Sequence, residues 1–334
     1  MISILQTLNQ LRYDLIGKDS YRGVTLTYSW LANQFGHFSL GYLPTLAVFS
    51  AWDGNAPSWL PLPPHEAAAV VVAGAWTSFE IVNFVLPILF SKKKSVFTPK
   101  WLNVGFDTFT DIMFFSVGAF TAGNYLGDST WLPIITTILC IAVAAASIYW
   151  YITKMYQQGA RFPLQVRLSQ WQNTISASHK KTVETFTLLA KKQPIHLLIT
   201  GNNGSGKTTL AIAIANEIAI QHKATYYTTA QKLISWLYEA PAGKLDPVQY
   251  WQWRNARVII VDDVNPGTPA NEEIIQPARL QNHILNTQQA AINLPALQQN
   301  SVIWVIGNVA VLPQWQQCLQ QLGIATQNQY VVSL

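Results

Sequence analysis

Residues 195–209 read IHLLITGNNGSGKTT, and this stretch decides the fold of the C-terminal part of the chain. A run of β-forming residues leads into GNNGSGKT at 201–208, which satisfies the spacing G-x-x-x-x-G-K-[ST], and an apolar run, LAIAIANEIAI, follows. Strand, glycine-rich loop and helix thus occur in the order that a phosphate-binding loop requires. The alternative is a glycine-rich turn that matches by chance, and the flanking strand and helix argue against it.

The residues of this loop predict how a polyphosphate is held. Three glycines let the backbone adopt positive φ angles and turn its N–H groups inward, toward the N-terminus of the following helix. We expect Lys207 to reach the β- and γ-phosphates of ATP, and the Thr208 hydroxyl to ligate Mg²⁺. The predicted nucleotide-binding residues are Gly201, Asn202, Asn203, Gly204, Ser205, Gly206, Lys207, Thr208 and Thr209.

The composition indicates that part of the chain lies in lipid. Of its 334 residues, 50% are hydrophobic and 11% are charged, whereas soluble domains carry about 25% charged residues. The formal net charge is +5, but the basic residues are unevenly spread, so nucleic acid is not implied as a partner. Cys140 and Cys318 lie far apart in the sequence, which favours neither a disulfide framework nor a zinc site.

Four segments have the length and apolarity of membrane-spanning helices, which need about 20 residues each. They lie at residues 30–52, 67–90, 102–123 and 131–152, within a transmembrane region predicted for residues 28–153. The first is the least regular, because polar residues and Pro44 interrupt it. Residues 1–27 carry leucines and isoleucines at helical spacing, which predicts an amphipathic segment in the cytoplasm or at the membrane interface.

Charges between these segments predict their orientation. Lysines and arginines lie before the first segment, between the second and third, and after the fourth, whereas residues 53–65 and 124–129 contain none. By the positive-inside rule both termini face the cytoplasm, where ATP is available. We therefore expect a multi-pass protein, in a bacterial inner membrane, whose phosphate-binding domain is cytoplasmic.

Four ionisable residues fall inside the expected spans: His37, Glu80, Asp107 and Asp111. Counted from the cytoplasmic ends, Glu80 and Asp111 come to similar depth, and so do His37 and Asp107. Because an unpaired charge is costly in lipid, the first interpretation is a hydrogen-bonded network that holds the helices together. A proton or ion path, or a substrate contact, is the alternative.

A second nucleotide motif is expected on another buried strand, and RVIIVDD at residues 257–263 provides it. Its β-branched residues are typical of a central parallel strand, and acids at the carboxyl end of such a strand lie where open α/β sheets bind ligands. We expect Asp262 to hold Mg²⁺, directly or through water, and Asp263 to orient or activate the attacking water. The alternative is a strand that merely ends in acidic turn residues.

Five strands are expected in this part of the chain, at residues 195–200, 224–228, 258–261, 302–306 and 330–332, with helices between them. They suit a three-layer α/β domain with a five-stranded, mainly parallel sheet. Residues 154–193 carry apolar residues at helical spacing, which predicts a helical connector from the membrane part. The polar segment 265–300 is too long for a plain loop, so we expect a helix at 272–289.

With these motifs, residues 194–334 resemble the AAA+ branch of the P-loop ATPases, and within it the helicase-loader and transposase-helper type. The fourth strand ends just before Asn308, and the resemblance implies that this residue, as sensor 1, contacts the γ-phosphate and the attacking water. It also implies a ring or other homo-oligomer with the nucleotide at subunit contacts. The resemblance does not extend to the membrane part.

Two features depart from the family pattern. The sequence stops soon after the fifth strand, so neither the small helical lid domain nor its sensor 2 arginine is expected. No lysine or arginine follows Arg279, so an arginine finger in trans would come from Arg279, Arg254 or Arg257, or from a partner protein. Without such a finger, turnover should be slow, because it contributes about 10³ to 10⁵ in rate.

Together these patterns predict a membrane-anchored ATPase that couples Mg·ATP hydrolysis to an unidentified protein client or assembly at the membrane. Catalysis would use Lys207, Asp262, Asp263 and Asn308. Two alternatives stay open: an oligomeric membrane scaffold gated by nucleotide with slow hydrolysis, and a multimeric transporter or ion-conducting bundle controlled by ATP. A GTPase is disfavoured because the sequence contains no N/T-K-x-D motif, and a small-molecule kinase rests on analogy of fold alone.

Overall fold

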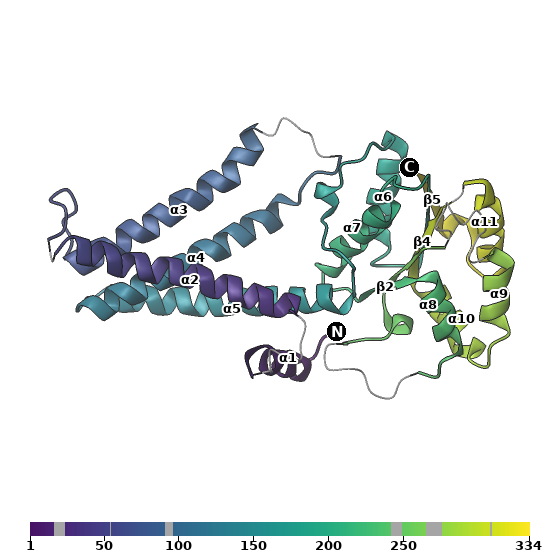
Figure 1. Ribbon diagram of the computed structural model, residues 1–334, viewed down its shortest axis with the longest axis horizontal. Coiled ribbons are helices and arrows are strands. Elements are labelled where there is room, and N and C mark those ends of the chain that lie inside the picture. Colours follow the sequence, from purple (N-terminus) through teal and green to yellow (C-terminus); the bar gives the residue numbers. More distant parts are fainter. Residues whose placement is uncertain (17–23, 54, 91–95, 242–248, 265–275, 308) are drawn as a thin grey trace. The chain divides into compact units, whose positions relative to one another are not determined.

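The computed structural model of the chain describes residues 1–16, 24–53, 55–90, 96–241, 249–264, 276–307 and 309–334. The chain divides into two compact units (Figure 1). The helical unit comprises residues 19–94 and 99–151, and the sheet unit comprises residues 1–18, 95–98 and 152–334.

Long helices make up the described part of the helical unit (Figure 1). They are α2 (Leu26–Ala51), α3 (Pro64–Phe90), α4 (Trp101–Leu126) and α5 (Leu132–Gly159), of which the last turns, from Ile152, belong to the sheet unit. Glycines let α2 and α4 approach closely, because a Cβ at Gly41 or Gly118 would collide with the main chain of the other helix. Helices therefore lie where the four apolar segments predicted them.

Two of these helices have the length and composition of membrane spans. Among the described residues, the stretches that qualify are 64–89 in α3 and 132–159 in α5. Only 17% of the apolar window in each is buried, whereas the core helix of a soluble protein would be mostly buried. Because α2 and α4 do not qualify, a bundle of four spans is not confirmed.

The ionisable residues expected inside the spans lie near one another in the helical unit. His37 Nδ1 is 3.0 Å from Asp111 Oδ1, and Glu80 and Asp107 interact electrostatically with His37. We expected His37 at the depth of Asp107, but its direct partner is Asp111, which lies one helical turn further along α4. This pairing agrees with a network that holds the helices together.

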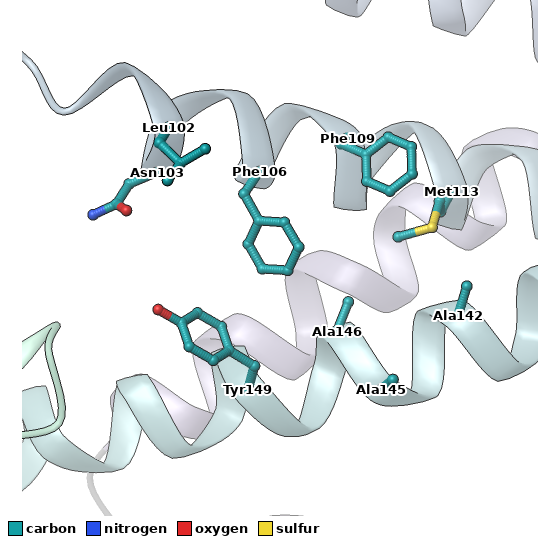
Figure 2. Close-up of a pocket in the computed structure, with 9 residues that line it drawn as sticks. All are labelled: Leu102, Asn103, Phe106, Phe109, Met113, Ala142, Ala145, Ala146 and Tyr149. Atoms are coloured by element: carbon teal, nitrogen blue, oxygen red, sulfur yellow. The ribbon is translucent and has the colours of Figure 1, made fainter.

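An apolar groove of about 560 Å³ lies between α4 and α5 (Figure 2). Alanines on α5 leave space that larger side chains of α4 face from the other side. The groove is lined by Leu102, Asn103, Phe106, Phe109, Met113, Ala142, Ala145, Ala146 and Tyr149. Its lining is almost entirely apolar.

The sheet unit contains a five-stranded parallel sheet in the order β2-β3-β4-β1-β5. The strands are β1 (His196–Thr200), β2 (Thr225–Thr229), β3 (Val258–Asp262), β4 (Ser301–Ile306) and β5 (Gln329–Ser333). Thr200 is in register with Ile306 and Ser333, and Thr229 with Asp262, so the carboxyl ends of the strands share one edge. The predicted α/β domain with a five-stranded parallel sheet is confirmed.

Helices cover both faces of this sheet (Figure 1). On one face lie α6 (Ala177–Leu189) and α7 (Lys207–Ala219), and on the other α8 (Ala230–Tyr238), α9 (Pro277–Leu285), α10 (Ala290–Gln299) and α11 (Leu312–Gln321). The buried run of α7 packs against Ile199, Ile260 and Ile303. On the other face Trp304 stacks on Trp315, with ring centroids 6.0 Å apart. Because both faces are covered, the central strands read as continuous apolar runs.

The sheet unit also contains α1 (Ile4–Ile16) and short 3₁₀ turns. These turns lie at Leu168–Gln170, Trp253–Asn255, Val309–Val311 and Thr326–Asn328.

Two helix predictions need correction. The connector predicted over 154–193 is not helical throughout, because α5 ends at Gly159, α6 begins at Ala177, and the 3₁₀ turn at 168–170 lies between them. Leu168 and Trp171 of this segment are buried in the core of the sheet unit instead. The helix predicted at 272–289 ends at Leu285 and is followed by the separate α10, while residues 272–275 lie outside the described residues.

Candidate nucleotide-binding site

The two predicted nucleotide motifs meet at the carboxyl edge of the sheet. β1 leads into the loop at residues 201–206, which ends where α7 begins at Lys207, and β3 ends at Asp262. β4 lies between β1 and β3, and its last residue, Ile306, is in register with Thr200. Asn308, which follows β4 in the sequence, lies outside the described residues.

Two glycines of the loop occupy positions that a side chain would disturb. Gly201 has a φ of +149°, and a Cβ there would lie 2.5 Å from the main-chain oxygen of Leu334. Gly206 precedes α7 with a φ of +86°, and a Cβ there would collide with the side-chain amide of Asn173. The glycine spacing of the motif therefore has a steric reason as well as a conformational one.

The loop holds its own lysine. Lys207 Nζ donates to the carbonyl oxygens of Gly201, over 2.9 Å, and of Asn202, over 2.7 Å. Burial lowers the pKa of the Lys207 ammonium, and the negative charge of Asp262 opposes that shift. Ser205 Oγ, in the same loop, is buried without a partner among the described residues. A cation and an unused polar atom are thus gathered where the motif predicts phosphate.

Asp262 is held by hydroxyl groups from two other elements. Thr208 Oγ1 donates to Asp262 Oδ1 over 3.1 Å, and the Tyr227 hydroxyl donates to Asp262 Oδ2 over 2.8 Å. Burial, followed by the charge of Asp262, raises the pKa of Tyr227, so its hydroxyl remains a donor. Hydroxyl and carboxylate oxygens are the ligands that Mg²⁺ prefers. The donor set therefore fits the metal predicted for Thr208 and Asp262.

Asp263 has an unusual backbone conformation and a carboxyl group whose pKa is raised. Its φ is +53°, in the left-handed region that Asp and Asn enter more readily than most residues. Its N–H donates to Asp262 Oδ1 over 2.9 Å. Burial, followed by the neighbouring Asp262 carboxylate, raises the pKa of Asp263. A carboxylate with a raised pKa is a better proton acceptor, which suits the role predicted for this residue.

Three side chains at the site were not predicted. Trp171 Nε1 donates to Gly206 O over 3.2 Å and Asn173 Nδ2 donates to Ser205 O over 2.6 Å, so the connector supports the loop from outside. No motif marks these two residues. Tyr227 could have been found, because it lies near the carboxyl end of a predicted strand and thus at the same edge as Asp262.

The arginines considered as fingers have different surroundings. Arg254 and Arg257 precede β3, whereas the site lies at its carboxyl end. Arg254 donates to Trp236 O over 2.8 Å, and Arg257 donates to Ala190 O over 3.0 Å, so both hold parts of the sheet unit together. Arg279 is exposed on α9. Of the three, Arg279 is the one whose side chain faces solvent.

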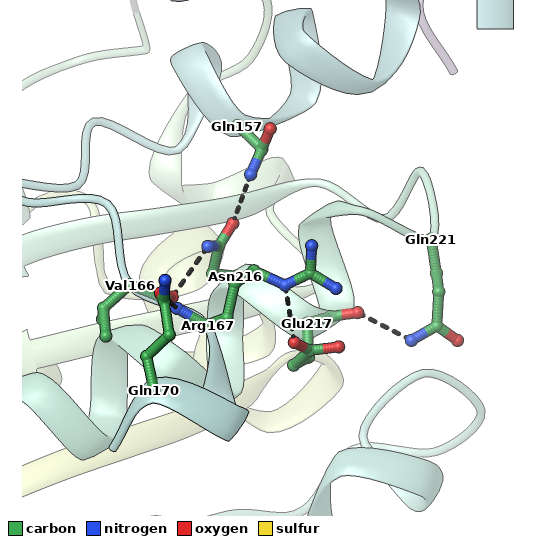
Figure 3. Close-up of polar contacts among 7 residues, drawn as sticks. All are labelled: Gln157, Val166, Arg167, Gln170, Asn216, Glu217 and Gln221. Atoms are coloured by element: carbon green, nitrogen blue, oxygen red, sulfur yellow. Dashed lines mark hydrogen bonds and ion pairs between the residues drawn. The ribbon is translucent and has the colours of Figure 1, made fainter. Parts of the chain in front are cut away.

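Hydrogen bonds and an ion pair join α7, the helix that begins at the site, to the last turns of α5 and to the segment that follows them (Figure 3). Gln157 Nε2, on α5, donates to Asn216 Oδ1, on α7, over 2.8 Å, and Asn216 Nδ2 donates to Val166 O over 2.8 Å. Arg167 Nε lies 2.9 Å from Glu217 Oε1. Gln157 and Asn216 are 6% and 1% exposed. A buried polar network thus ties the helix that begins at the phosphate loop to α5.

Comparison with known proteins agrees with this geometry. Residues 152–270 match the family model described as IstB-like ATP binding protein, and the match includes the loop and both aspartates. The chain is also similar to the Holliday junction branch migration complex subunit RuvB of Campylobacter curvus (strain 525.92), with 30% identity over 123 residues. The same subunit of Campylobacter concisus (strain 13826) is 30% identical over 121 residues.

These similarities cover one part of the chain. The two RuvB matches span 36% and 35% of this chain and 33% of each relative, so the chain spans about a third of the length of the curated relatives it matches. The AAA+ resemblance predicted from the two nucleotide motifs is confirmed for this part. Residues 152–270 resemble an IstB-like ATP-binding domain, which is a P-loop NTPase domain related to the AAA+ ATPases.

Proposed function

We propose that this chain is a membrane-anchored ATPase that binds and hydrolyses Mg·ATP on the cytoplasmic side of the membrane. The observation that carries the proposal is the meeting of Lys207, Thr208 and Asp262 beside one glycine loop, with Thr208 Oγ1 3.1 Å from Asp262 Oδ1. A hydroxyl, a carboxylate and an ammonium in this arrangement are the groups that hold Mg²⁺ and the terminal phosphates in P-loop NTPases.

Each residue has a role in the proposed reaction. The loop N–H groups and Lys207 bind the phosphates, Thr208 and Asp262 hold Mg²⁺, and the Tyr227 hydroxyl fixes the orientation of Asp262. When bound, Mg²⁺ would neutralise negative charge on the terminal phosphates. Asp263 orients the attacking water and accepts its proton, and Asn308 contacts the γ-phosphate.

Three features support membrane anchoring. α3 and α5 are long, apolar and mostly unburied, the groove between α4 and α5 is lined by apolar side chains, and the basic residues are confined to alternate loops. The proposed topology is a multi-pass protein of a bacterial inner membrane with both termini in the cytoplasm. The sheet unit then has access to cellular ATP.

The network between α7 and α5 supports coupling of the site to the membrane part. α5 is one continuous helix from Leu132 to Gly159, and its Gln157 contacts the helix that begins at Lys207 through Asn216. A nucleotide-dependent shift of α7 would therefore act directly on α5. We propose that this shift drives a homo-oligomer, with Arg279 or a partner protein supplying the arginine finger, to act on a protein client.

A nucleotide-gated scaffold with slow hydrolysis is the second candidate. Within the described ranges, no arginine makes a hydrogen bond or ion pair with the loop or with Asp262, and an arginine finger accounts for much of the rate in related enzymes. A low basal rate together with an ATP-dependent change in oligomer size would favour the scaffold. Fast turnover by the purified chain would favour the ATPase.

An ion-conducting bundle is the third candidate. The pairing of His37 with Asp111 supports a structural role for the intramembrane acids, because a satisfied pair has less need of a transported ion. A flux assay on Glu80→Gln and Asp111→Asn distinguishes a structural role of these acids from ion conduction. Loss of an ATP-controlled flux in these variants would support conduction.

The test of the proposed function is ATP turnover by the full chain in bilayer nanodiscs. Lys207→Ala is expected to abolish turnover, whereas Lys232→Ala, at an exposed position of α8, is expected to leave it unchanged. Undiminished turnover in Lys207→Ala would rule the proposed site out.

A further inference from the structure

Two polar side chains of α1 are buried against the rest of the sheet unit, whereas most of its apolar side chains are exposed. Gln10 and Asp14 are 2% and 1% exposed. The opposite face carries Ile4, Leu8, Leu15 and Ile16, which are 81%, 57%, 68% and 77% exposed. An amphipathic helix of a soluble protein packs the other way round, with its apolar stripe on the core.

Specific hydrogen bonds fix this orientation. The Tyr250 hydroxyl donates to Gln10 Oε1 over 2.8 Å, and Gln10 Nε2 donates to Asp14 Oδ1 over 2.9 Å. Burial, followed by the negative charge of Asp14, raises the pKa of Tyr250, so its hydroxyl remains a donor. Rotation of α1 about its axis would break this network and leave buried polar groups without partners. The apolar face is therefore directed outward by the chain's own contacts.

The position of α1 along α5 places it near the expected membrane surface. Ile2 N, just before α1, donates to the hydroxyl of Tyr156 on α5 over 3.3 Å. The fourth expected span ends at Ile152, and four further residues of helix advance by about 6 Å. The headgroup region on each side of the hydrocarbon core is about as thick, at roughly 5 to 7 Å. α1 is thus held at headgroup level if α5 crosses the bilayer.

We propose that α1 binds the bilayer surface, with its apolar face at the boundary between headgroups and acyl chains. The inference rests on the membrane anchoring proposed above. A helix in this position buries its apolar side chains in lipid, and the exposed Arg12 can extend its guanidinium to an anionic headgroup. Through Gln10, bound α1 also holds the Tyr250 segment, which precedes β3, close to the membrane.

The test uses the cysteines that the chain already has. Cys140 is exposed near the middle of the fourth expected span and Cys318 is buried, so a thiol-reactive nitroxide should label the wild-type chain at Cys140. In a Cys140→Ser background, Leu8→Cys and Leu15→Cys place the label on the outer face of α1. Gln317→Cys, at an exposed position of α11, gives the aqueous reference. The full chain is studied in nanodiscs of phosphatidylcholine and phosphatidylglycerol.

The measurement is the rate of collision of each label with oxygen, which concentrates in lipid, and with a water-soluble nickel chelate. Labels at residues 8 and 15 are expected to behave like the label at Cys140, with oxygen collisions dominant, and the Gln317→Cys label is expected to behave oppositely. If labels 8 and 15 behave like the aqueous reference while Cys140 remains in lipid, the inference about α1 is overturned and the membrane anchoring stands. An aqueous Cys140 label overturns the anchoring itself.

A second copy of the chain is the competing occupant of this face. Labels at residues 8 and 15 that are shielded from both reagents and show dipolar broadening between copies would overturn binding to lipid.

Amide exchange of chains without a label gives an independent readout. Leu8→Gln combined with Leu15→Gln is expected to speed exchange of residues 4–16 at least threefold in nanodiscs, and the matched Asn9→Gln is not. An unchanged rate in the double variant contradicts the proposal.

Discussion

Thr208 Oγ1 donates a hydrogen bond to Asp262 Oδ1 over 3.1 Å, which joins the first turn of α7 to the end of β3. β1, which leads into the loop, and β3 are not neighbours in the sheet, because β4 lies between them. The contact therefore depends on the whole parallel arrangement, which brings the carboxyl ends of separate strands to one edge. The Tyr227 hydroxyl donates to the other oxygen of the same carboxylate and helps to fix its orientation.

Tyr227→Phe is expected to weaken Mg²⁺ binding at the site without abolishing ATP turnover. Loss of a hydrogen bond of about 1 kcal/mol should raise the Mg²⁺ concentration for half-maximal turnover by about fivefold. Asp262→Asn, which removes the charge that holds the metal, should abolish turnover. Tyr226→Phe is the matched control, because Tyr226 packs on Trp236 instead. The same Mg²⁺ dependence in Tyr227→Phe and the wild type would exclude the role given to Tyr227.

Trp171→Phe and Asn173→Ala test the support that the connector gives to the loop. Each removes one donor to a loop carbonyl, of Gly206 or Ser205, so the KM for ATP should rise by about three- to tenfold while kcat changes less. Gln172→Ala, at the exposed position between them, should leave both constants unchanged. Steady-state turnover in nanodiscs measures this. A fall in kcat at constant KM would contradict a positioning role.

The sequence predicted the parts of the fold that local pattern controls. The phosphate loop, the acids of β3 and all five strands lie within a residue or two of their predicted positions, because a glycine spacing and an uninterrupted β-branched run are short-range signals. Parallel pairing places the carboxyl ends of the strands at one edge and so explains the Thr208–Asp262 contact, but the order of the strands was not predicted. Arg279 and Asn308 stay predictions.

The connector could not be predicted in this way. Leu164, Leu168, Trp171 and Ile175 repeat at helical spacing, but this segment instead lays Leu168 and Trp171 on the core of the sheet unit. The spacing of these residues matches that of a helix by coincidence. In this segment, as in an amphipathic helix, the apolar residues lie on the side that faces the protein. Trp171 and Asn173, which donate to the loop carbonyls, lie in this segment, and nothing in its sequence indicated that it contacts the site.

His196 makes the stability of the sheet unit sensitive to acid. Burial lowers the pKa of His196 from 6.5 to about 4, and its ring lies between Leu297 O, 3.2 Å from Nε2, and Trp304 Nε1, 3.1 Å from Nδ1. The folded state keeps this ring neutral, whereas the unfolded chain protonates it below its ordinary pKa. Stability is therefore complete above pH 6.5 and decreases as the pH falls toward 4, by up to about 3 kcal/mol.

Thermal unfolding followed by tryptophan fluorescence measures this loss between pH 7 and pH 4.5. His196→Gln is expected to lower stability at pH 7 but to flatten its dependence on pH, while His179→Gln, on α6, should keep the wild-type slope. An unchanged slope in His196→Gln would contradict the assignment.

Gln157 and Asn216 are expected to be energetically coupled. Asn216→Ala leaves the Gln157 amide and the Val166 carbonyl without their partner in a buried site, which should destabilise the sheet unit by about 1 to 3 kcal/mol. A double-mutant cycle with Gln157→Ala should give a coupling energy of about 0.5 to 2 kcal/mol. Chemical denaturation of the four proteins provides the values. Strict additivity would show that this contact carries no coupling between α7 and α5.

The most direct test of the proposed site is equilibrium binding of ATP to the full chain in bilayer nanodiscs, with and without Mg²⁺. The wild type should bind ATP, and Mg²⁺ should tighten binding at least tenfold. Thr208→Val and Asp262→Asn should remove that Mg²⁺ effect, and Lys207→Ala should weaken binding under both conditions. Equal affinity in the wild type and Lys207→Ala, with no response to Mg²⁺, would contradict nucleotide binding at this loop.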